Sequence, residues 1–233
     1  MNESRLNNLN HPGRPQLPAT DIYCLTASNY SLGRSNLVIV REMLDAGIKI
    51  VQYREKDLTM REKYQECVAL REMTAKAKAT FIINDDIHLA LAVNADGVHI
   101  GQDDLPVQKA RELVAGRMLI GLSTHSPKQA RDAVAAGVDY IGVGPVYRTF
   151  TKKDVCDPVG LDYVRFAAQN ITIPWVAIGG IKEDNVAEVI QNGARMVAMV
   201  TEIVGSRDIK GKIEAIRRRI QQVKESGPCI KPR

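Results

Sequence analysis

The stretch TFIINDDIHLALAVNADGVHIGQDD, residues 80–104, contains the pattern that decides the fold. Two short apolar runs, TFIIN (80–84) and GVHIG (97–101), are separated by a helical pattern that ends in the turn residues NAD (94–96). Neither run alternates with polar residues, which is typical of parallel strands buried on both faces. The stretch therefore predicts a strand, a helix and a second strand that runs parallel to the first.

The same unit recurs along the chain. Further apolar runs are IYCLT (22–26), IKIVQYR (48–54), MLIGLS (118–123), YIGVG (140–144), WVAIGG (175–180) and MVAMV (196–200). Eight such runs, each with room for a helix before the next, predict a single (βα)8 TIM barrel. An open doubly wound sheet is the alternative, but no GxGxxG motif follows the first predicted strand, as that fold would favour.

Helix-start signals agree with this reading. Residues 59–62 (TMRE) and 126–129 (SPKQ) both fit the capping box, and the second has proline at the first helical position. Residues 185–188 (NVAE) are predicted to begin another helix.

Composition narrows the class of protein. The 233 residues are 45% hydrophobic and 25% charged, which is ordinary for one globular domain. The formal net charge is +5, but basic residues are interleaved with acidic ones, so nucleic acid is not expected and anionic small molecules suit the charge as well. Four cysteines (Cys24, Cys67, Cys156 and Cys229) lack the spacing of a disulfide or zinc framework.

The sequence shows no sign of a membrane or export segment. No apolar run approaches the roughly 20 residues that a membrane helix needs, and residues 1–20 are polar and contain proline. We therefore expect a cytoplasmic protein with a disordered extension at 1–20, a catalytic barrel at 21–224 and a tail at 225–233. The expected partners are small-molecule substrates, with no nucleic acid and no membrane, and a homo-oligomer is left open.

In a TIM barrel the active site lies at the carboxyl ends of the strands. In VQYREK (51–56), strand alternation places Gln52, Arg54 and Lys56 on one face, where an amide, a guanidinium and an ammonium suit a phosphate. The alternative is that this strand leaves the barrel and its cations form ion pairs with Glu55 or Asp57 at the rim.

Acidic residues follow two neighbouring strands. INDD (83–86) and GQDD (101–104) can bring Asp85 and Asp104 together at the barrel mouth, and Mg²⁺ favours a few carboxylates with water and substrate phosphate. For Asp86 and Asp103 a helix N-cap is a competing role.

Glycines and a long loop suggest a phosphate site. Gly179 and Gly180 allow close approach of an anion to the main chain, and with Val200 and Thr201 they occupy the loops where many barrels bind phosphate; a tight turn is the alternative. Loop 145–158 carries Thr149, Thr151, Lys152 and Lys153 and is predicted to be a lid, with a solvated polar loop as the alternative.

Two histidines need separate treatment. His99 lies inside an apolar run and is expected to be a packed, hydrogen-bonded core residue. His125 follows Ser123 at a strand end and is the better placed of the two to touch ligand. Neither is predicted to belong to a nucleophilic triad.

Taken together, the motifs resemble those of the thiamine-phosphate synthase family. The segments are QYREK (52–56), INDD (83–86), ADGVHIGQDDLP (95–106), GLSTHS (121–126), GVGPVYRTFTKK (142–153) and AIGGI (177–181). The resemblance implies a Mg²⁺-dependent transferase that joins a hydroxymethylpyrimidine pyrophosphate to a thiazole phosphate and releases pyrophosphate. Arg148 stands where the family usually has proline, and Ala27 where an acidic residue is frequent.

The resemblance also implies roles for individual residues. The metal would be held by Asp85 and Asp104. The pyrimidine ring and its pyrophosphate would be bound by Gln52, Arg54, Lys56, Asn84, Ser123 and Lys152, of which Arg54, Ser123 and Lys152 would be catalytic. The thiazole phosphate would be held by Thr149, Thr151, Gly180, Val200 and Thr201. No protein nucleophile is needed, because pyrophosphate can leave before the thiazole nitrogen attacks. A thiazole tautomerase of the same fold and a non-catalytic phosphate-binding barrel are the alternatives.

Overall fold

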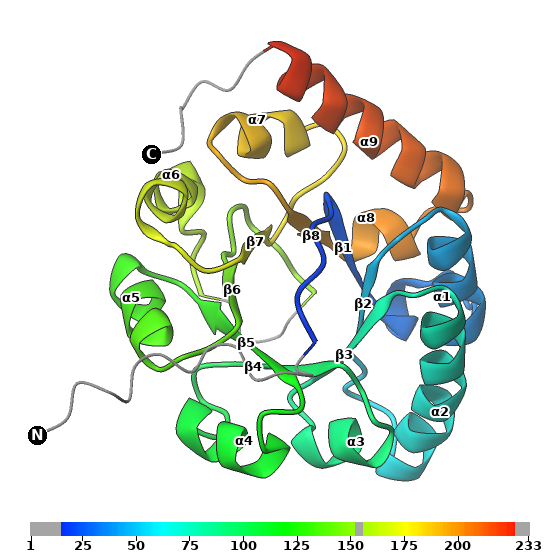
Figure 1. Ribbon diagram of the computed structural model, residues 1–233. Coiled ribbons are helices and arrows are strands. Elements are labelled where there is room, and N and C mark those ends of the chain that lie inside the picture. The colour runs from blue at the N-terminus through cyan, green and yellow to red at the C-terminus, as the bar shows by residue number, and fades with distance from the viewer. Residues whose placement is uncertain (1–14, 152–155, 227–233) are drawn as a thin grey trace, which may run out of the picture.

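A closed barrel of parallel strands forms the centre of the computed structural model, which describes residues 15–151 and 156–226. The strands are β1 (Ile22–Leu25), β2 (Ile50–Tyr53), β3 (Thr80–Asn84), β4 (Gly97–Ile100), β5 (Leu119–Thr124), β6 (Tyr140–Val143), β7 (Trp175–Ile178) and β8 (Val197–Met199). Each pairs with the next in sequence order, and β8 pairs with β1 to close the ring (Figure 1). The predicted TIM barrel is confirmed, with all eight predicted strands present.

Helices cover the outside of this barrel (Figure 1). They are α1 (Asn36–Asp45), α2 (Met60–Lys76), α3 (Ile87–Ala92), α4 (Val107–Val114), α5 (Pro127–Ala135), α6 (Gly160–Asn170), α7 (Val186–Gln191), α8 (Thr201–Val204) and α9 (Ile209–Ser226), with a 3-10 turn η1 (Ser28–Tyr30). The described helices include none long and apolar enough to span a membrane.

The helix starts follow the predicted signals closely. Thr59 caps α2 in a complete capping box with Glu62, as predicted. Ser126 caps α5, but Gln129 accepts from the backbone N–H of His125 at 2.7 Å rather than from that of Ser126, so the second box is only half formed. Asn185 stands at the start of α7, as predicted.

The strands are buried on two sides because they separate two apolar clusters. One cluster fills the barrel and includes Tyr23, Ile50, Ile82, Leu119 and Tyr140. The other lies between the strands and the surrounding helices. This two-sided burial explains why the strand sequences do not alternate between apolar and polar residues.

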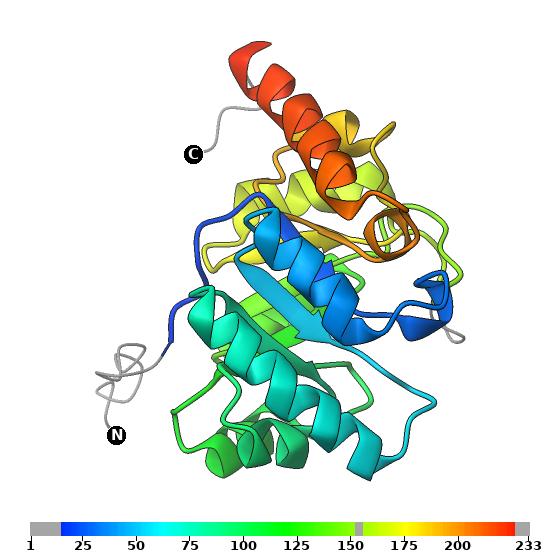
Figure 2. The ribbon, with the colours of Figure 1, turned by 90° about the vertical axis from the view of Figure 1, so that its right-hand side faces the viewer.

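The N-terminal segment lies at one end of the barrel. Residues 15–20 contain no helix or strand, and Leu17 packs against the cluster inside the barrel. In Figure 2 this segment is at the left, while η1 and the loop after β6 are at the opposite end. Of the extension predicted to be disordered at 1–20, residues 1–14 lie outside the described residues, as do residues 227–233 of the predicted tail at 225–233.

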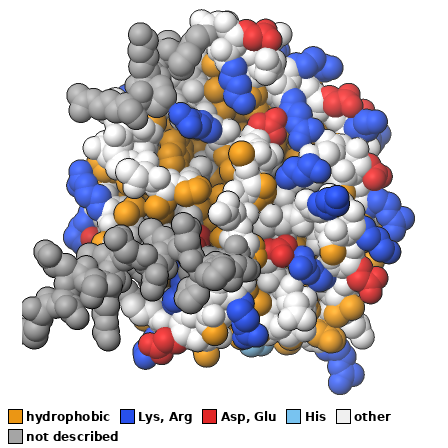
Figure 3. All heavy atoms as spheres, viewed as in Figure 1, with side chains coloured by type: hydrophobic (Ala, Val, Ile, Leu, Met, Phe, Trp, Pro, Cys, Tyr) orange, Lys and Arg blue, Asp and Glu red, His pale blue; other side chains and the backbone are white. Residues whose placement is uncertain are grey.

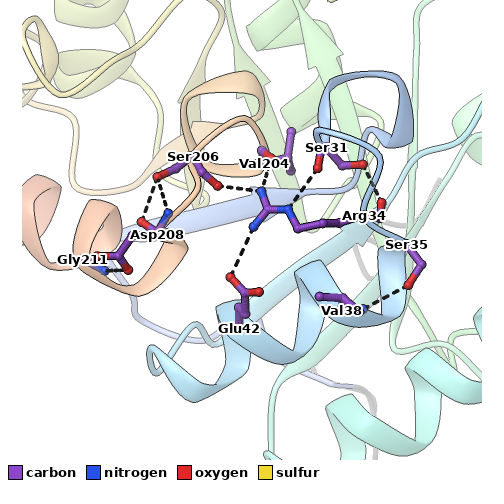
Figure 4. A network of polar contacts seen from close by, with 9 residues as sticks. All are labelled: Ser31, Arg34, Ser35, Val38, Glu42, Val204, Ser206, Asp208 and Gly211. Atoms are coloured by element: carbon purple, nitrogen blue, oxygen red, sulfur yellow. Dashed lines mark hydrogen bonds and ion pairs between the residues drawn. The ribbon is translucent and has the colours of Figure 1, made fainter.

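Arg34 joins the first and the last units of the barrel. Its guanidinium donates to the carbonyls of Val204 at 2.8 Å and Ser206 at 2.6 Å, and to that of Ser31 at 3.0 Å (Figure 4). Glu42 on α1 accepts from the same group at 3.5 Å. These bonds fix the carboxyl end of α8 against the loop before α1, so they help to position the loop that follows β8.

Candidate active site

A cavity lies at the carboxyl ends of the strands, where the sequence places the active site. Its lining includes six of the predicted site residues, namely Gln52, Arg54, Lys56, Asn84, Asp85 and Ser123. They come from β2, β3 and β5 and from the residues that follow β2 and β3. The barrel thus brings together side chains that are up to 71 positions apart in the sequence, from 52 to 123.

The end of β2 points its residues in two directions, as strand alternation predicted. Gln52, Arg54 and Lys56 face the cavity. On the other side, Tyr53 donates to Glu66 on α2, and Glu55 accepts from the Ser28 hydroxyl at 2.6 Å. Glu55 is thus held by neighbouring elements, and the cations of this strand end turn towards the cavity.

Two carboxylates meet at this mouth. Lys56 Nζ lies 2.5 Å from Asp85 Oδ2, and the backbone N–H of Gly101 donates to Asp104 Oδ2 at 2.6 Å. Burial raises the pKa of Asp104 above its ordinary range, and the nearby charge of Asp85 raises it further. Asp85 and Asp104 therefore lie close enough to repel each other, while their role as a shared cation site stays a prediction.

Asp85 is also held in an uncommon backbone conformation. Its φ of +60° lies in the left-handed region, which residues other than glycine seldom adopt, although aspartate adopts it more readily than most. Its backbone N–H donates to the carbonyl of His99 at 2.8 Å, so the β3 end is tied to β4. Such conformations gather at functional sites, where the surrounding structure maintains them.

The alternative N-cap roles are resolved by the helix starts. Asp86 occupies the N-cap position of α3, but its side chain makes no capping bond and instead pairs with Lys63 Nζ at 3.0 Å. The α4 helix begins at Val107 with Pro106 at its N-cap, so an N-cap role for Asp103 is wrong.

The loop after β6 approaches η1 across the mouth. The hydroxyls of Thr149 and Thr151 are 2.7 Å apart, and Tyr30 in η1 donates to the carbonyl of Phe150 at 3.1 Å. The predicted residue Lys152 lies outside the described residues.

The loops after β6 and β7 are in close contact. The backbone N–H of Tyr147 donates to the carbonyl of Gly179 at 2.9 Å. Gly180 has a φ of +63°, and a Cβ added there would lie 2.6 Å from the Arg148 carbonyl oxygen, so no larger residue fits without movement. Arg148, which departs from the family pattern, stacks its guanidinium on Phe150 with 5.3 Å to the ring centroid.

The predicted thiazole phosphate residues lie around the cavity rather than in its lining. Val200 is the N-cap of α8 and Thr201 is its first residue, next to the loop after β7. Lys212 on α9 joins the loop after β7 to α8 by ion pairs to Glu183 at 2.9 Å and Glu202 at 3.3 Å. Thr149, Thr151 and Gly180 complete the set in the neighbouring loops.

The two histidines have different surroundings, and His99 is buried as expected. His99 lines the cavity, and both of its ring nitrogens have partners, the Tyr140 hydroxyl at 3.1 Å and the Ser123 hydroxyl at 3.0 Å. It is hydrogen-bonded as expected, but it faces the site. His125, in contrast, places Nδ1 2.6 Å from the Gly144 carbonyl and so holds the start of the loop after β6.

Sequence reasoning missed two tyrosines at the site. Tyr23 lines the cavity and Tyr140 lies behind it, and each is within 3.1 Å of another polar side chain. Both stand inside apolar runs, where an aromatic residue reads as core, so the sequence carries no local signal for their polar role.

Comparison with known proteins identifies the family. The family model described as thiamine monophosphate synthase matches residues 22–203. The thiamine-phosphate synthase of Pelotomaculum thermopropionicum is 61% identical, with 88% of this chain and 94% of that protein covered. The corresponding protein of Lawsonia intracellularis is 50% identical, with coverage of 86% and 92%.

A solved structure agrees with these sequence matches. The thiamine phosphate pyrophosphorylase from Pyrococcus furiosus superimposes with a TM-score of 0.79 at 33% identity, over 87% of this chain and 96% of that one. The region matched by the family model contains all eight strands and every predicted site residue. The chain therefore belongs to the thiamine-phosphate synthase family.

Proposed function

We propose that this transferase condenses 4-amino-2-methyl-5-hydroxymethylpyrimidine pyrophosphate with 4-methyl-5-(2-phosphoethyl)thiazole, giving thiamine phosphate and pyrophosphate. The observation that carries the proposal is the convergence of Gln52, Arg54, Lys56, Asn84 and Ser123 on one cavity with a carboxylate pair at its edge. This combination provides cations for a pyrophosphate and polar groups for a pyrimidine ring. The charged substrates cannot cross a membrane unaided, which supports a cytoplasmic location.

The carboxylate pair fits Mg²⁺. Asp85 and Asp104 offer hard oxygen ligands, and their mutual repulsion is what a divalent cation would relieve. Mg²⁺ commonly takes only one or two carboxylates from a protein and completes its shell with water and substrate phosphate, so two aspartates would be enough. When bound, Mg²⁺ would neutralise charge on the pyrophosphate as it leaves.

The cationic side chains have a direct role in this proposal. Arg54 presents a planar guanidinium to the cavity, which suits bidentate binding of phosphate oxygens. Lys56, bound to Asp85 at 2.5 Å, adds a second positive charge next to the metal ligands. Together with Lys152, these groups would stabilise the negative charge that develops on the leaving pyrophosphate.

The neutral polar groups orient the acceptor and the donor. Gln52, Asn84 and Ser123 would hold the pyrimidine ring so that its methylene carbon faces the thiazole nitrogen. Thr149 and Thr151, with backbone N–H groups near Gly180, Val200 and Thr201, would hold the thiazole phosphate. Because the aminopyrimidine stabilises a methylene cation, pyrophosphate departs first and the thiazole nitrogen then attacks, so alignment is the main task of the protein.

Ser123 contacts His99, yet this pair does not replace the proposed mechanism. The third group in contact with His99 is the phenol of Tyr140 rather than a carboxylate of the kind that orients the base in a serine triad. A hydrogen-bonding role for Ser123 requires no covalent intermediate.

Pyrophosphate release from the two substrates tests the proposal. The wild-type protein should release pyrophosphate only when both substrates and Mg²⁺ are present, and Asp85→Asn should reduce the rate by about 100-fold or more. Asp132→Asn is the control, because it removes an exposed carboxylate that pairs with Lys128 on α5 and does not line the cavity. It should leave the rate unchanged.

The same assay separates the alternatives. An inactive wild type that isomerises a thiazole carboxylate phosphate would be a tautomerase, and one that only binds phosphates would be a non-catalytic barrel. Either outcome would overturn the proposed reaction.

A further inference from the structure

A row of hydrogen bonds crosses the barrel from one side of the cavity to the other. Gln52 Nε2 donates to the Tyr23 hydroxyl at 2.7 Å, and the hydroxyls of Tyr23 and Tyr140 are 3.0 Å apart. Tyr140 then contacts His99 Nδ1 at 3.1 Å, and His99 Nε2 contacts the Ser123 hydroxyl at 3.0 Å. The first and last residues of this row, Gln52 and Ser123, both line the cavity.

The middle of the row is buried, and the surrounding backbone leaves room for it. Tyr23 is 1% exposed and Tyr140 is fully buried. A Cβ added at Gly121 would lie 2.5 Å from His99 Nδ1 and closer still to the Tyr140 ring, so only glycine at this position allows the contact. Burial raises the pKa of both phenols, so each keeps its proton at neutral pH.

Chemistry favours one direction for the protons in this row. An amide nitrogen only donates, so Tyr23 accepts from Gln52 and can pass its own proton to Tyr140. Tyr140 then donates to His99 Nδ1, and the N–H on Nε2 donates to the Ser123 hydroxyl. In the reverse direction Tyr23 would accept twice, and its own proton would need another acceptor in a buried site, which costs free energy.

This direction determines what the ends of the row offer to a ligand. Ser123 accepts from His99 Nε2, so its own hydroxyl proton is available to donate into the cavity. Gln52 uses one of its two amide N–H groups on Tyr23, so its orientation is fixed and its carbonyl Oε1 remains as an acceptor. The cavity therefore presents an acceptor on β2 and a donor on β5.

We propose that Tyr23, Tyr140 and His99 are positioning residues that set this hydrogen-bonding polarity, and that the polarity selects a 4-aminopyrimidine over a 4-oxopyrimidine. A 4-aminopyrimidine offers amine N–H donors beside a ring nitrogen that accepts. The 4-oxo compound offers a carbonyl acceptor beside a ring N–H donor, which is the opposite pattern. The inference rests on the proposed function, since that reaction supplies the pyrimidine pyrophosphate.

The test compares the binding of two ligands. Titration calorimetry with Mg²⁺, and without the thiazole phosphate, gives dissociation constants for the 4-amino and the 4-oxo pyrimidine pyrophosphates. Wild type should bind the amino compound more tightly. Tyr140→Phe removes one hydroxyl from the middle of the row and frees the His99 tautomer, so the preference should fall about tenfold.

The variants are chosen to distinguish polarity from packing. Tyr163→Phe removes another buried phenol, whose hydroxyl donates to Thr124 Oγ1 at 2.7 Å and does not line the cavity. This variant should leave the preference unchanged. Tyr23→Phe breaks the row at an earlier link and should reduce the preference as Tyr140→Phe does, which keeps the test available if one variant fails to fold.

The outcomes separate this inference from the proposed function. It is overturned if wild type shows no preference, or if the folded Tyr140→Phe and Tyr23→Phe proteins keep the wild-type ratio. If turnover of both substrates fails while the ratio still falls only in these two variants, the proposed reaction is wrong and the polarity inference stands.

Discussion

The two ends of the barrel use charged residues in different ways. At the amino ends of the strands, an aspartate before a strand pairs with an arginine from a helix in three places: Asp21 with Arg217, Asp96 with Arg71, and Asp139 with Arg111. At the carboxyl ends, cations and amides face a shared cavity, and two carboxylates lie close enough to repel each other.

The amino-terminal pairs are satisfied within the protein. Asp96 also accepts from the backbone N–H of Phe81 at 2.8 Å, and Asp139 from that of Ile120 at 2.7 Å. These two pairs therefore each tie a helix to two neighbouring strands. On the face shown in Figure 3, basic side chains are spread around the rim with acidic ones between them.

The difference suggests that one end stabilises the fold and the other binds and transforms ligand. Charges that meet partners inside the protein add to stability, whereas like charges held together at a mouth cost stability and suit a ligand of opposite charge. Substitutions at the two ends should therefore separate activity from stability.

The largest effect is expected at the mouth. Arg54→Ala removes the guanidinium that faces the cavity, and pyrophosphate release should fall by about 10³-fold because charge on the leaving group loses a strong partner. The free energy of unfolding should change by less than about 0.5 kcal/mol. Steady-state kinetics and urea unfolding check both values.

The exposed Arg61 at the start of α2 provides the control for this change. Arg61→Ala removes the same charge from the protein and should leave the rate unchanged. Equal loss of activity in the two variants would mean that overall charge, rather than the position of Arg54, matters.

A smaller effect, and on stability alone, is expected at the other end. Arg111→Met removes the bonds to Asp139 at 2.7 Å and to the carbonyls of Met118 and Gly137, and should lower the free energy of unfolding by about 2–3 kcal/mol. The kinetic constants of the folded enzyme should not change.

Lys109→Met is the matched control, since it removes a positive charge two residues earlier on the same helix. Its ion pair with Glu112 is exposed on both sides, so the loss should be below about 0.5 kcal/mol. If both variants lost the same stability, the amino-terminal pairs would not be the stabilising elements that the comparison suggests.

Some parts of the site could be predicted from the sequence and others could not. Backbone periodicity dictates that Gln52, Arg54 and Lys56 share a face, so the sequence alone predicted the cavity side of β2. Parallel strands also align their carboxyl ends, so residues after β3 and β4 could be expected to meet. These parts of the site depend on local rules and on the fold class.

The hydrogen-bonded row from Gln52 to Ser123 depends on side-chain packing across the barrel rather than on local rules. Tyr23 and Tyr140 are 117 positions apart and meet only because both point into the barrel at the same height. A tyrosine in an apolar run carries no sign of which distant group its hydroxyl will reach. Side-chain partners across the barrel depend on packing, and that is why this part of the site could not be predicted.

The smallest effect concerns the carboxylate pair at the mouth. Because burial and the charge of Asp85 raise the pKa of Asp104, its carboxylic acid holds a proton more tightly in the folded chain than in the unfolded one. The ionised form therefore costs stability at neutral pH, and that cost is relieved as the pH falls through the raised pKa. In metal-free protein, Asp104→Asn should raise the free energy of unfolding by less than about 1 kcal/mol, since only part of the side chain is buried and water screens the rest.

Magnesium should make wild type more stable than Asp104→Asn, which reverses their order of stability without metal. An ion that binds only the folded state stabilises it, so Mg²⁺ should raise the unfolding midpoint of wild type and leave that of Asp104→Asn almost unchanged. Asp103→Asn, next to it and also exposed, should behave like wild type. If Asp104→Asn were less stable than wild type without metal, the mouth would be using its carboxylates as the amino-terminal end does, for stability, and the contrast between the two ends would fail.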